Sequence, residues 1–202
     1  MDSTAGITIA IQEAARDMGL PVPAREAASH VIGLGLHDSL RGAVPSLPVE
    51  KYGDFVALYR KHFGAQQETM ALFPGVRDLL EDLRARTFRL AVATGKSRRG
   101  LDHALQATGL ARYFSASRCA DETSPKPHPA MLLELMQDFG LESRELLMIG
   151  DTSHDLGMAK NAGVDAVAVG YGAHPIEALG AWRPRACVNS VGELREWLTK
   201  NA

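Results

Sequence analysis

From residue 76 onward the chain alternates short aliphatic runs with helical segments, and this alternation limits the fold more than any other feature. The runs that predict strands lie at residues 88–93, 114–119, 146–149, 165–169 and 186–188. Segments with helical spacing of apolar residues lie at 76–86, 97–109, 129–139, 153–162 and 191–200. Strands that are apolar throughout and alternate with helices predict an α/β fold with a parallel sheet covered by helices on both faces.

The preceding part of the chain has helical patterns and no convincing strand. The first helix begins at Thr4, a suitable N-cap, and its apolar residues recur at steps of three and four. Pro23 and Pro48 can each begin a further helix, because proline at the first helical position loses no needed hydrogen bond. We therefore predict a helical-bundle domain over residues 4–73 and an α/β domain over residues 74–202.

Composition and charge exclude several classes of function. The 22 Lys and Arg residues against 24 Asp and Glu give a net charge of −2, without a basic run suited to nucleic acid. Cys119 and Cys187 are too few for a disulfide framework or a four-ligand zinc site. No apolar run approaches the roughly 20 residues that cross a bilayer, and the polar residues 2–4 do not resemble a secretory signal. We expect a cytoplasmic protein that binds neither membrane nor nucleic acid; its oligomeric state stays open.

Ligands of open parallel sheets bind beyond the carboxyl ends of the strands, so the residues that follow each strand are the candidates for a site. The strand at 88–93 runs into Thr94-Gly95-Lys96-Ser97, which opens a helix. A hydroxyl, a small residue and an ammonium at a helix N-terminus suit an anion such as phosphate. The alternative is that Ser97 only caps the helix and that Lys96 is solvated.

Two carboxylates follow the strand at 146–149. Asp151 and Asp155 lie four residues apart, directly after Gly150. Such acids can cap a helix and complement its dipole. They can also hold Mg²⁺, which prefers oxygen ligands and takes one or two carboxylates together with water and phosphate oxygens.

Lys126 lies in a loop with three prolines in five residues, Pro125, Pro127 and Pro129. Each proline fixes its own φ and restricts the residue before it, so this lysine is held in position although it lies outside regular structure. It suits the neutralisation of a phosphate or of a carboxylate nucleophile. A solvated loop lysine is the alternative.

Together these three segments resemble the haloacid dehalogenase superfamily, in its phosphatase branch with a helical cap. The resemblance covers nearly the whole chain and implies a Rossmann-like core with Mg²⁺ as cofactor. It implies that Thr94 and the Gly95 amide bind phosphate, that Lys126 is the lysine of the third motif, and that Asp151 is the metal ligand. Asp155 would support the lysine or a metal-bound water. Residues 169–175 are most similar to phosphoglycolate phosphatases.

The first motif of that superfamily, D-x-D-G-T after a strand, has no match in this chain. Residues 1–3 match only its tail, so the nucleophile and the general acid would fall before Met1. Without a carboxylate nucleophile the phosphoaspartyl route is closed, and we expect residues 1–202 to be inactive. The absent strand would lie between those ending at Thr94 and Asp151, where unpaired backbone groups cost roughly 1–3 kcal/mol each. We expect that a longer reading frame supplies it, or that residues were removed.

Three smaller signals have less specific readings. His154 is interpreted as a solvated residue at a helix start, although an imidazole can bind metal. Cys119 is interpreted as a buried structural cysteine. Residues 31–36 read either as a substrate-specificity loop, by resemblance, or as core packing beside a turn.

The sequence therefore predicts a capped, Mg²⁺-dependent phosphatase for a small phosphorylated metabolite such as phosphoglycolate. A non-catalytic remnant that still binds a phosphometabolite through Thr94 and Lys126 is the alternative. A phosphosugar mutase also stays open, because the sequence does not fix the sugar contacts of the cap. A dehalogenase would need no magnesium, and a phosphonatase would need a cap lysine, which nothing places at the site.

Overall fold

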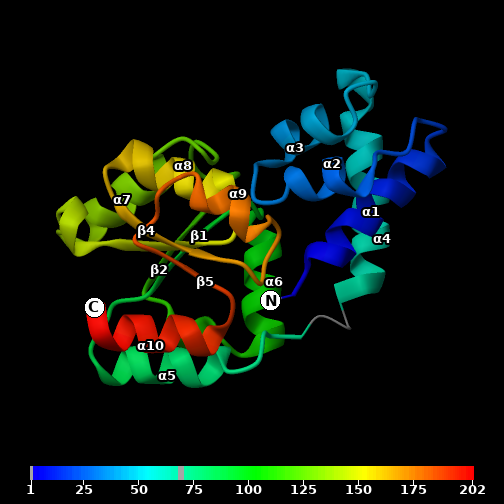
Figure 1. The fold of residues 1–202 in the computed structure, drawn as a ribbon. Coiled ribbons are helices and arrows are strands. Elements are labelled where there is room, and N and C mark those ends of the chain that lie inside the picture. Colours follow the sequence, from blue (N-terminus) through cyan, green and yellow to red (C-terminus); the bar gives the residue numbers. More distant parts are fainter. Residues whose placement is uncertain (1, 68–70) are drawn as a thin grey trace.

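The computed structural model describes residues 2–67 and 71–202. Its helical part consists of α1 (Thr4–Asp17), α2 (Arg25–His30), α3 (Leu36–Ala43), the 3-10 turn η1 (Val49–Lys51) and α4 (Tyr52–Gln67). Helices α1 and α4 pack side by side, with α2 and α3 against them (Figure 1). Their apolar faces meet in a cluster of their own, which includes Ile11, Ala14 and Phe55.

The α/β part follows the predicted order of elements. Its helices are α5 (Val76–Ala85), α6 (Arg98–Thr108), α7 (Ala130–Phe139), α8 (Ser153–Ala162), α9 (Ile176–Gly180) and α10 (Val191–Asn201). Its strands are β1 (Ala91–Thr94), β2 (Ala116–Cys119), β3 (Leu147–Gly150), β4 (Asp165–Val169) and β5 (Ala186–Val188). Two 3-10 turns, η2 (Ala111–Tyr113) and η3 (Ser143–Glu145), precede β2 and β3.

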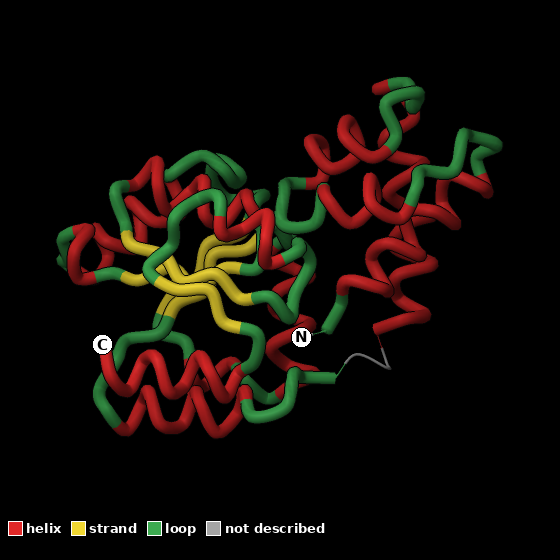
Figure 2. Tube along the Cα trace, in the orientation of Figure 1, coloured by secondary structure: helices red, strands yellow, loops and turns green. Residues whose placement is uncertain are grey.

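Helices cover both faces of the strand layer, as Figures 1 and 2 show. Ala166 and Ala168 of β4 pack in the cluster formed with α7, α8 and α9. Val167 and Val169, which alternate with these alanines along the strand, pack on the opposite face with α5 and α10. This alternation accounts for the continuous apolar run of β4, because successive side chains of a strand point to opposite faces. The α/β class is therefore confirmed.

The expectation of a single sheet is wrong for the described residues. Strands β1 and β2 form a two-stranded parallel sheet, and β3, β4 and β5 form a separate three-stranded parallel sheet in that order. Strands β1 and β3 do not pair with each other within the described ranges. They are the two strands between which an absent strand was expected.

The first strand begins later than its apolar pattern predicts. Phe88 donates its N–H to the carbonyl of Leu83, and Thr87, with φ 65°, donates to Arg84. These bonds satisfy carbonyls at the end of α5, so Phe88 belongs to the helix termination and β1 starts at Ala91. The predicted domain boundary at 73/74 stays a prediction. It lies close to residues 68–70, which are outside the described residues. No helix in the described ranges combines the length and apolarity needed to cross a membrane.

Candidate functional site

One cavity brings the candidate residues together. It has a volume of about 690 Å³ and lies between the helical part and the carboxyl ends of β1 and β3. All five candidate site residues line it: Thr94, Gly95, Lys126, Asp151 and Asp155. Residues from three separate segments therefore converge where a parallel sheet presents its ligand-binding edge.

The segment after β1 contains the hydroxyl of Thr94 and, at Gly95, a close contact with the backbone of the helical part. The N–H of Lys96 donates to Oγ1 of Thr94 at 3.2 Å. Ser97 caps α6 by accepting from the N–H of Gly100 at 3.3 Å, as the capping interpretation predicted. A Cβ built on Gly95 would lie 2.5 Å from the carbonyl oxygens of Gly33 and Leu34. The turn of the helical part at 31–34 therefore rests directly on Gly95, and only glycine permits that contact.

Lys126 is held by a buried ion pair. Its ammonium lies 2.6 Å from Oδ1 of Asp155, and the two side chains are 6% and 4% exposed. Oδ2 of Asp155 accepts the hydroxyl and the N–H of Thr152, at 2.7 and 3.1 Å, in the capping box of α8. Burial pushes the pKa of Asp155 upward, but Lys126 and Thr152 more than offset it, so the pKa is lowered. Asp155 is thus an ionised anchor that points the lysine into the cavity, and the solvated-loop alternative for Lys126 is wrong.

Asp151 has a different environment, although it lies only four residues away. Its Oδ2 accepts the N–H of Ala173 at 2.8 Å, and none of the ion pairs in the described residues includes it. A Cβ on Gly172 would overlap its carboxyl group, so the loop after β4 wraps closely around it. Burial, and then repulsion by Asp155, raise the pKa of Asp151. A desolvated carboxylate without a cationic partner is suited to a cation.

The donor set fits Mg²⁺ with one protein carboxylate. No group of three or more His, Cys, Asp and Glu residues that could hold a metal occurs within residues 2–67 and 71–202. A dedicated protein cage is therefore not present there. Mg²⁺ keeps several waters and binds through one or two carboxylates plus phosphate oxygens. The carboxylate of Asp151 could serve as the protein ligand of such a site, next to the residues suited to phosphate.

Lys96 is a second cation in the cavity. Its ammonium lies 5.3 Å from the ring centroid of Phe63, which belongs to α4. It is half-buried, and no acidic side chain in the described part forms an ion pair with it. Burial lowers its pKa, because the charged form loses hydration. An anionic ligand in the cavity would compensate that charge.

Three histidines join the helical part to the site, and the sequence did not predict this junction. The carbonyl of His30 accepts Nε2–H bonds from His154 at 2.8 Å and from His174 at 3.0 Å. The rings of His30 and His174 stack with centroids 4.9 Å apart. Nδ1 of His174 accepts the N–H of Ser153 at 3.0 Å, so the proton of the neutral ring lies on Nε2. The interpretation of His154 as solvated is wrong, because its side chain is half-buried in this junction. Burial lowers the pKa of His154 and the pKa of His174.

Other features lie apart from the site or support the chain's packing. Cys119 is completely buried, as predicted, and burial raises its pKa to about 11, which disfavours the thiolate nucleophile.

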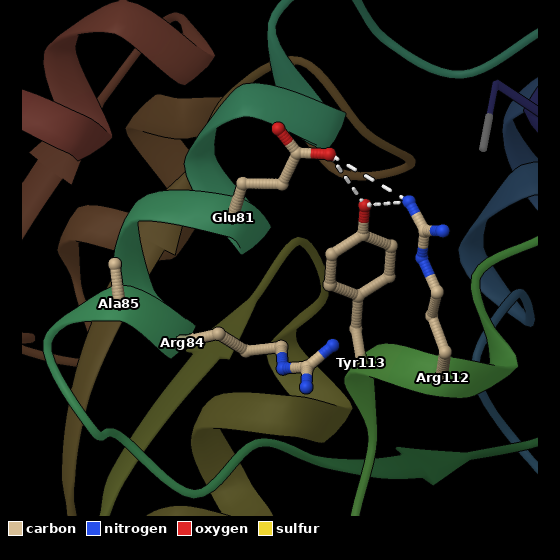
Figure 3. A pocket seen from close by; sticks show the side chains of 5 residues that line it. All are labelled: Glu81, Arg84, Ala85, Arg112 and Tyr113. Atoms are coloured by element: carbon tan, nitrogen blue, oxygen red, sulfur yellow. Dashed lines mark hydrogen bonds and ion pairs between the residues drawn. The ribbon is translucent and has the colours of Figure 1, made fainter.

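A second hollow of about 450 Å³ lies between α5 and η2 (Figure 3). Its lining residues are Glu81, Arg84, Ala85, Arg112 and Tyr113. Tyr113 donates to Glu81 at 2.7 Å and accepts from Arg112 at 2.9 Å, so this hollow is a paired surface cluster and contains no candidate residue.

The fold and the site define an α/β protein in which a helical part faces a strand edge suited to phosphate. Residues 1–169 match the family described as haloacid dehalogenase-like hydrolase, and the chain belongs to this family. It is 37% identical over 200 residues to the probable phosphatase IndB of Dickeya dadantii, covering 96% of this chain and 86% of that protein. It is 29% identical over 212 residues to a phosphoglycolate phosphatase of Vibrio parahaemolyticus, covering 100% and 92%.

A solved structure supports the same fold. The crystal structure of a hydrolase from Pseudomonas syringae aligns with a TM-score of 0.90 at 22% identity, over 100% of this chain and 94% of that one. The family resemblance drawn from Thr94, Lys126, Asp151 and Asp155 is therefore confirmed at the level of fold and family.

Proposed function

We propose that the protein is a Mg²⁺-dependent phosphatase that acts on a small phosphorylated metabolite such as phosphoglycolate. The convergence of Thr94, Lys126 and Asp151 on one cavity is the observation that carries the proposal. Similarity to phosphatase relatives supports the reaction class. The cavity volume of about 690 Å³ suits a small ligand.

In the proposed site, each residue has a role that follows from its environment. The Thr94 hydroxyl and the Gly95 N–H bind phosphoryl oxygens, and the Lys126 ammonium neutralises their charge, held in place by Asp155. Asp151 would hold Mg²⁺, which supplies charge stabilisation of the phosphoryl group when bound. The helical part, residues 4–73, acts as a cap that excludes water and selects the substrate.

We further propose that residues 1–202 alone lack the carboxylate nucleophile. Among the described residues, the acids that line the cavity are Asp151 and Asp155. Asp155 is committed to Lys126 and Thr152, and Asp151 is the candidate metal ligand. Asp2 is exposed and does not line the cavity; its N–H donates to the carbonyl of Ala71. This observation also favours the second candidate function, a protein that binds a phosphometabolite without turning it over.

The test compares residues 1–202 with a chain extended upstream by about ten residues in the original reading frame. Both are assayed with and without Mg²⁺ on small phosphate esters that include phosphoglycolate. We expect Mg²⁺-dependent release of phosphate from the extended chain, loss of this activity in its Asp151→Asn variant, and none from residues 1–202. The phosphatase proposal is wrong if the extended chain releases no phosphate from any ester. Activity of residues 1–202 would refute the absence of a nucleophile.

A further inference from the structure

The docking segment, residues 30–35 of the helical part, contacts every segment that carries a candidate site residue. It rests on the segment after β1 through the carbonyl oxygens of its fourth and fifth residues. A Cβ built on Gly33 would lie 3.1 Å from the hydroxyl oxygen of Thr152, at the start of α8. A Cβ built on Gly35 would lie 3.0 Å from Cβ of Pro125, in the loop of the site lysine. One short segment therefore adjoins the anion-binding turn, the lysine loop and the acidic helix start.

The docking segment begins at His30, the last residue of α2, whose carbonyl is one of those that a helix end leaves without an intrahelical partner. Two side chains of the α/β part satisfy it: Nε2–H of His154 donates at 2.8 Å and Nε2–H of His174 at 3.0 Å. The rings of His30 and His174 also stack at an angle of 10°. These contacts anchor the docking segment on the α/β part.

His174 continues into the loop that surrounds Asp151. Its own N–H donates to the carbonyl of Asp151 at 3.1 Å, and the N–H of Ala173 donates to Oδ2 of the carboxylate at 2.8 Å. Gly172 packs so closely that a Cβ there would overlap the same carboxyl group. His154 shares the His30 acceptor but lies on α8, outside this loop. His174 is thus the residue through which the docking segment reaches both the main chain and the side chain of Asp151.

Both ring nitrogens of His174 are engaged, and the side chain is only 5% exposed. Nδ1 accepts the N–H of Ser153, and Nε2–H donates to the carbonyl of His30. A ring that only filled space could be replaced by any planar apolar side chain. The use of one acceptor and one donor toward two different parts of the molecule indicates a role in orientation as well as in packing.

We propose that His174 is a positioning residue that couples the docking of residues 30–35 to the binding of a divalent cation at Asp151. The proposal rests on the proposed function, in which Asp151 is the cation ligand. With the segment docked, the bond to His30 holds the loop that orients the Asp151 carboxylate, so that less order has to be gained on binding. Because coupling is reciprocal, a bound cation also favours the docked segment.

Two amide variants separate the two bonds of the ring. In His174→Gln the side-chain amide nitrogen can replace Nε2 and donate to His30. In His174→Asn the amide oxygen can replace Nδ1 and accept from Ser153, but the link to His30 is lost. Mn²⁺, which like Mg²⁺ suits oxygen ligands, is titrated into residues 1–202, and electron paramagnetic resonance measures the free ion. We expect at least tenfold weaker binding in His174→Asn and a change of less than twofold in His174→Gln.

His128→Asn is the matched control. His128 is an exposed loop histidine whose Nδ1 accepts the N–H of Ala130 at 3.2 Å, so the substitution has the same chemistry outside the junction. Its affinity for Mn²⁺ should equal that of the unmodified protein. Amide hydrogen exchange of residues 25–35 supplies a second measurement. Mg²⁺ should slow this exchange in the unmodified protein and in His174→Gln, and should leave it unchanged in His174→Asn, an effect that a purely structural role would not produce.

The outcomes distinguish this inference from the proposed function. If the unmodified protein binds no more Mn²⁺ than Asp151→Asn, the assignment of Asp151 as cation ligand is wrong and the inference is overturned with it. If Mn²⁺ binds at Asp151 but His174→Asn binds it equally well, or His174→Gln loses as much affinity as His174→Asn, the inference alone is overturned. If His174→Asn does not fold, the inference is overturned by weak binding in a folded His174→Gln or by exchange that Mg²⁺ does not slow in the unmodified protein.

Discussion

The ion pair between Lys126 and Asp155 gives the sharpest quantitative prediction. Replacement by methionine, in Lys126→Met, keeps most of the side-chain volume and removes the ammonium 2.6 Å from the carboxylate. Both partners are almost completely buried, so the variant leaves an uncompensated charge in the interior. Breaking a buried pair in this way costs about 3–5 kcal/mol. For a chain of this size, that corresponds to a decrease in Tm of roughly 6–20 °C.

The free energy of unfolding is measured by urea denaturation at pH 7, followed by circular dichroism. Arg185→Met is the matched control, because Arg185 forms an ion pair with Asp165 at 2.9 Å in which the side chains are 62% and 54% exposed. An exposed pair contributes about 0–1 kcal/mol. Adding Asp155→Asn to Lys126→Met should recover part of the loss, since the unpaired charge is removed. Equal costs for Lys126→Met and Arg185→Met would refute the reasoning.

The same pair predicts a pH dependence. The folded-state pKa of Asp155 is lowered, so its stabilisation is present above the ordinary carboxyl pKa and is lost as the pH falls through the folded value. In Lys126→Met, the buried Asp155 can become neutral by taking up a proton at acidic pH. The difference in unfolding free energy between the two proteins should therefore be larger at pH 7 than at pH 3. A difference that grows on acidification would contradict this assignment of the charge.

Three further predictions concern the cavity and the cysteines. Asp151→Asn should raise Tm without Mg²⁺, because burial raises the pKa of this carboxyl and it forms no ion pair within the described residues. Thermal unfolding in EDTA measures the Tm, and a lower Tm in the variant would contradict the prediction. Gly95→Ala should weaken phosphate binding, because the added Cβ would overlap the carbonyl oxygen of Gly33. Calorimetry measures the affinity for phosphate, and an unchanged affinity together with an unchanged Tm would refute that contact. A thiol reagent at pH 8 should label exposed Cys187 and leave buried Cys119 unmodified until the protein unfolds, and mass spectrometry of the labelled peptides identifies each thiol.

Local sequence patterns were sufficient to predict the elements that carry the site. Asp151 and Asp155 follow a short apolar run, and the structure has a strand and a helix start there. Interactions between nearby residues, such as the capping box of Thr152 and Asp155, determine this junction. The start of β1 was predicted too early because the helix-ending bonds of Thr87 and Phe88 override an aliphatic pattern.

Contacts between distant segments could not be predicted. The approach of Gly33 to Gly95 joins residues 62 positions apart, and no local pattern encodes it. The His30 junction likewise depends on backbone and ring positions that exist only after the helical part has packed on α8. The division into two sheets arises because β1 pairs with β2 and β3 pairs with β4, and β1 and β3 do not pair with each other in the described residues; this pairing is a property of the whole layer.

The central claim is that phosphate and Mg²⁺ bind together at the ends of β1 and β3, and calorimetry tests it most directly. Inorganic phosphate is titrated into residues 1–202 with and without Mg²⁺, and the titration is repeated with Asp151→Asn. We expect Mg²⁺ to increase the affinity for phosphate in the unmodified protein and to have no effect in the variant, because coupling requires both ligands at one site. Equal coupling in both proteins, or no phosphate binding by the unmodified chain, would contradict the account.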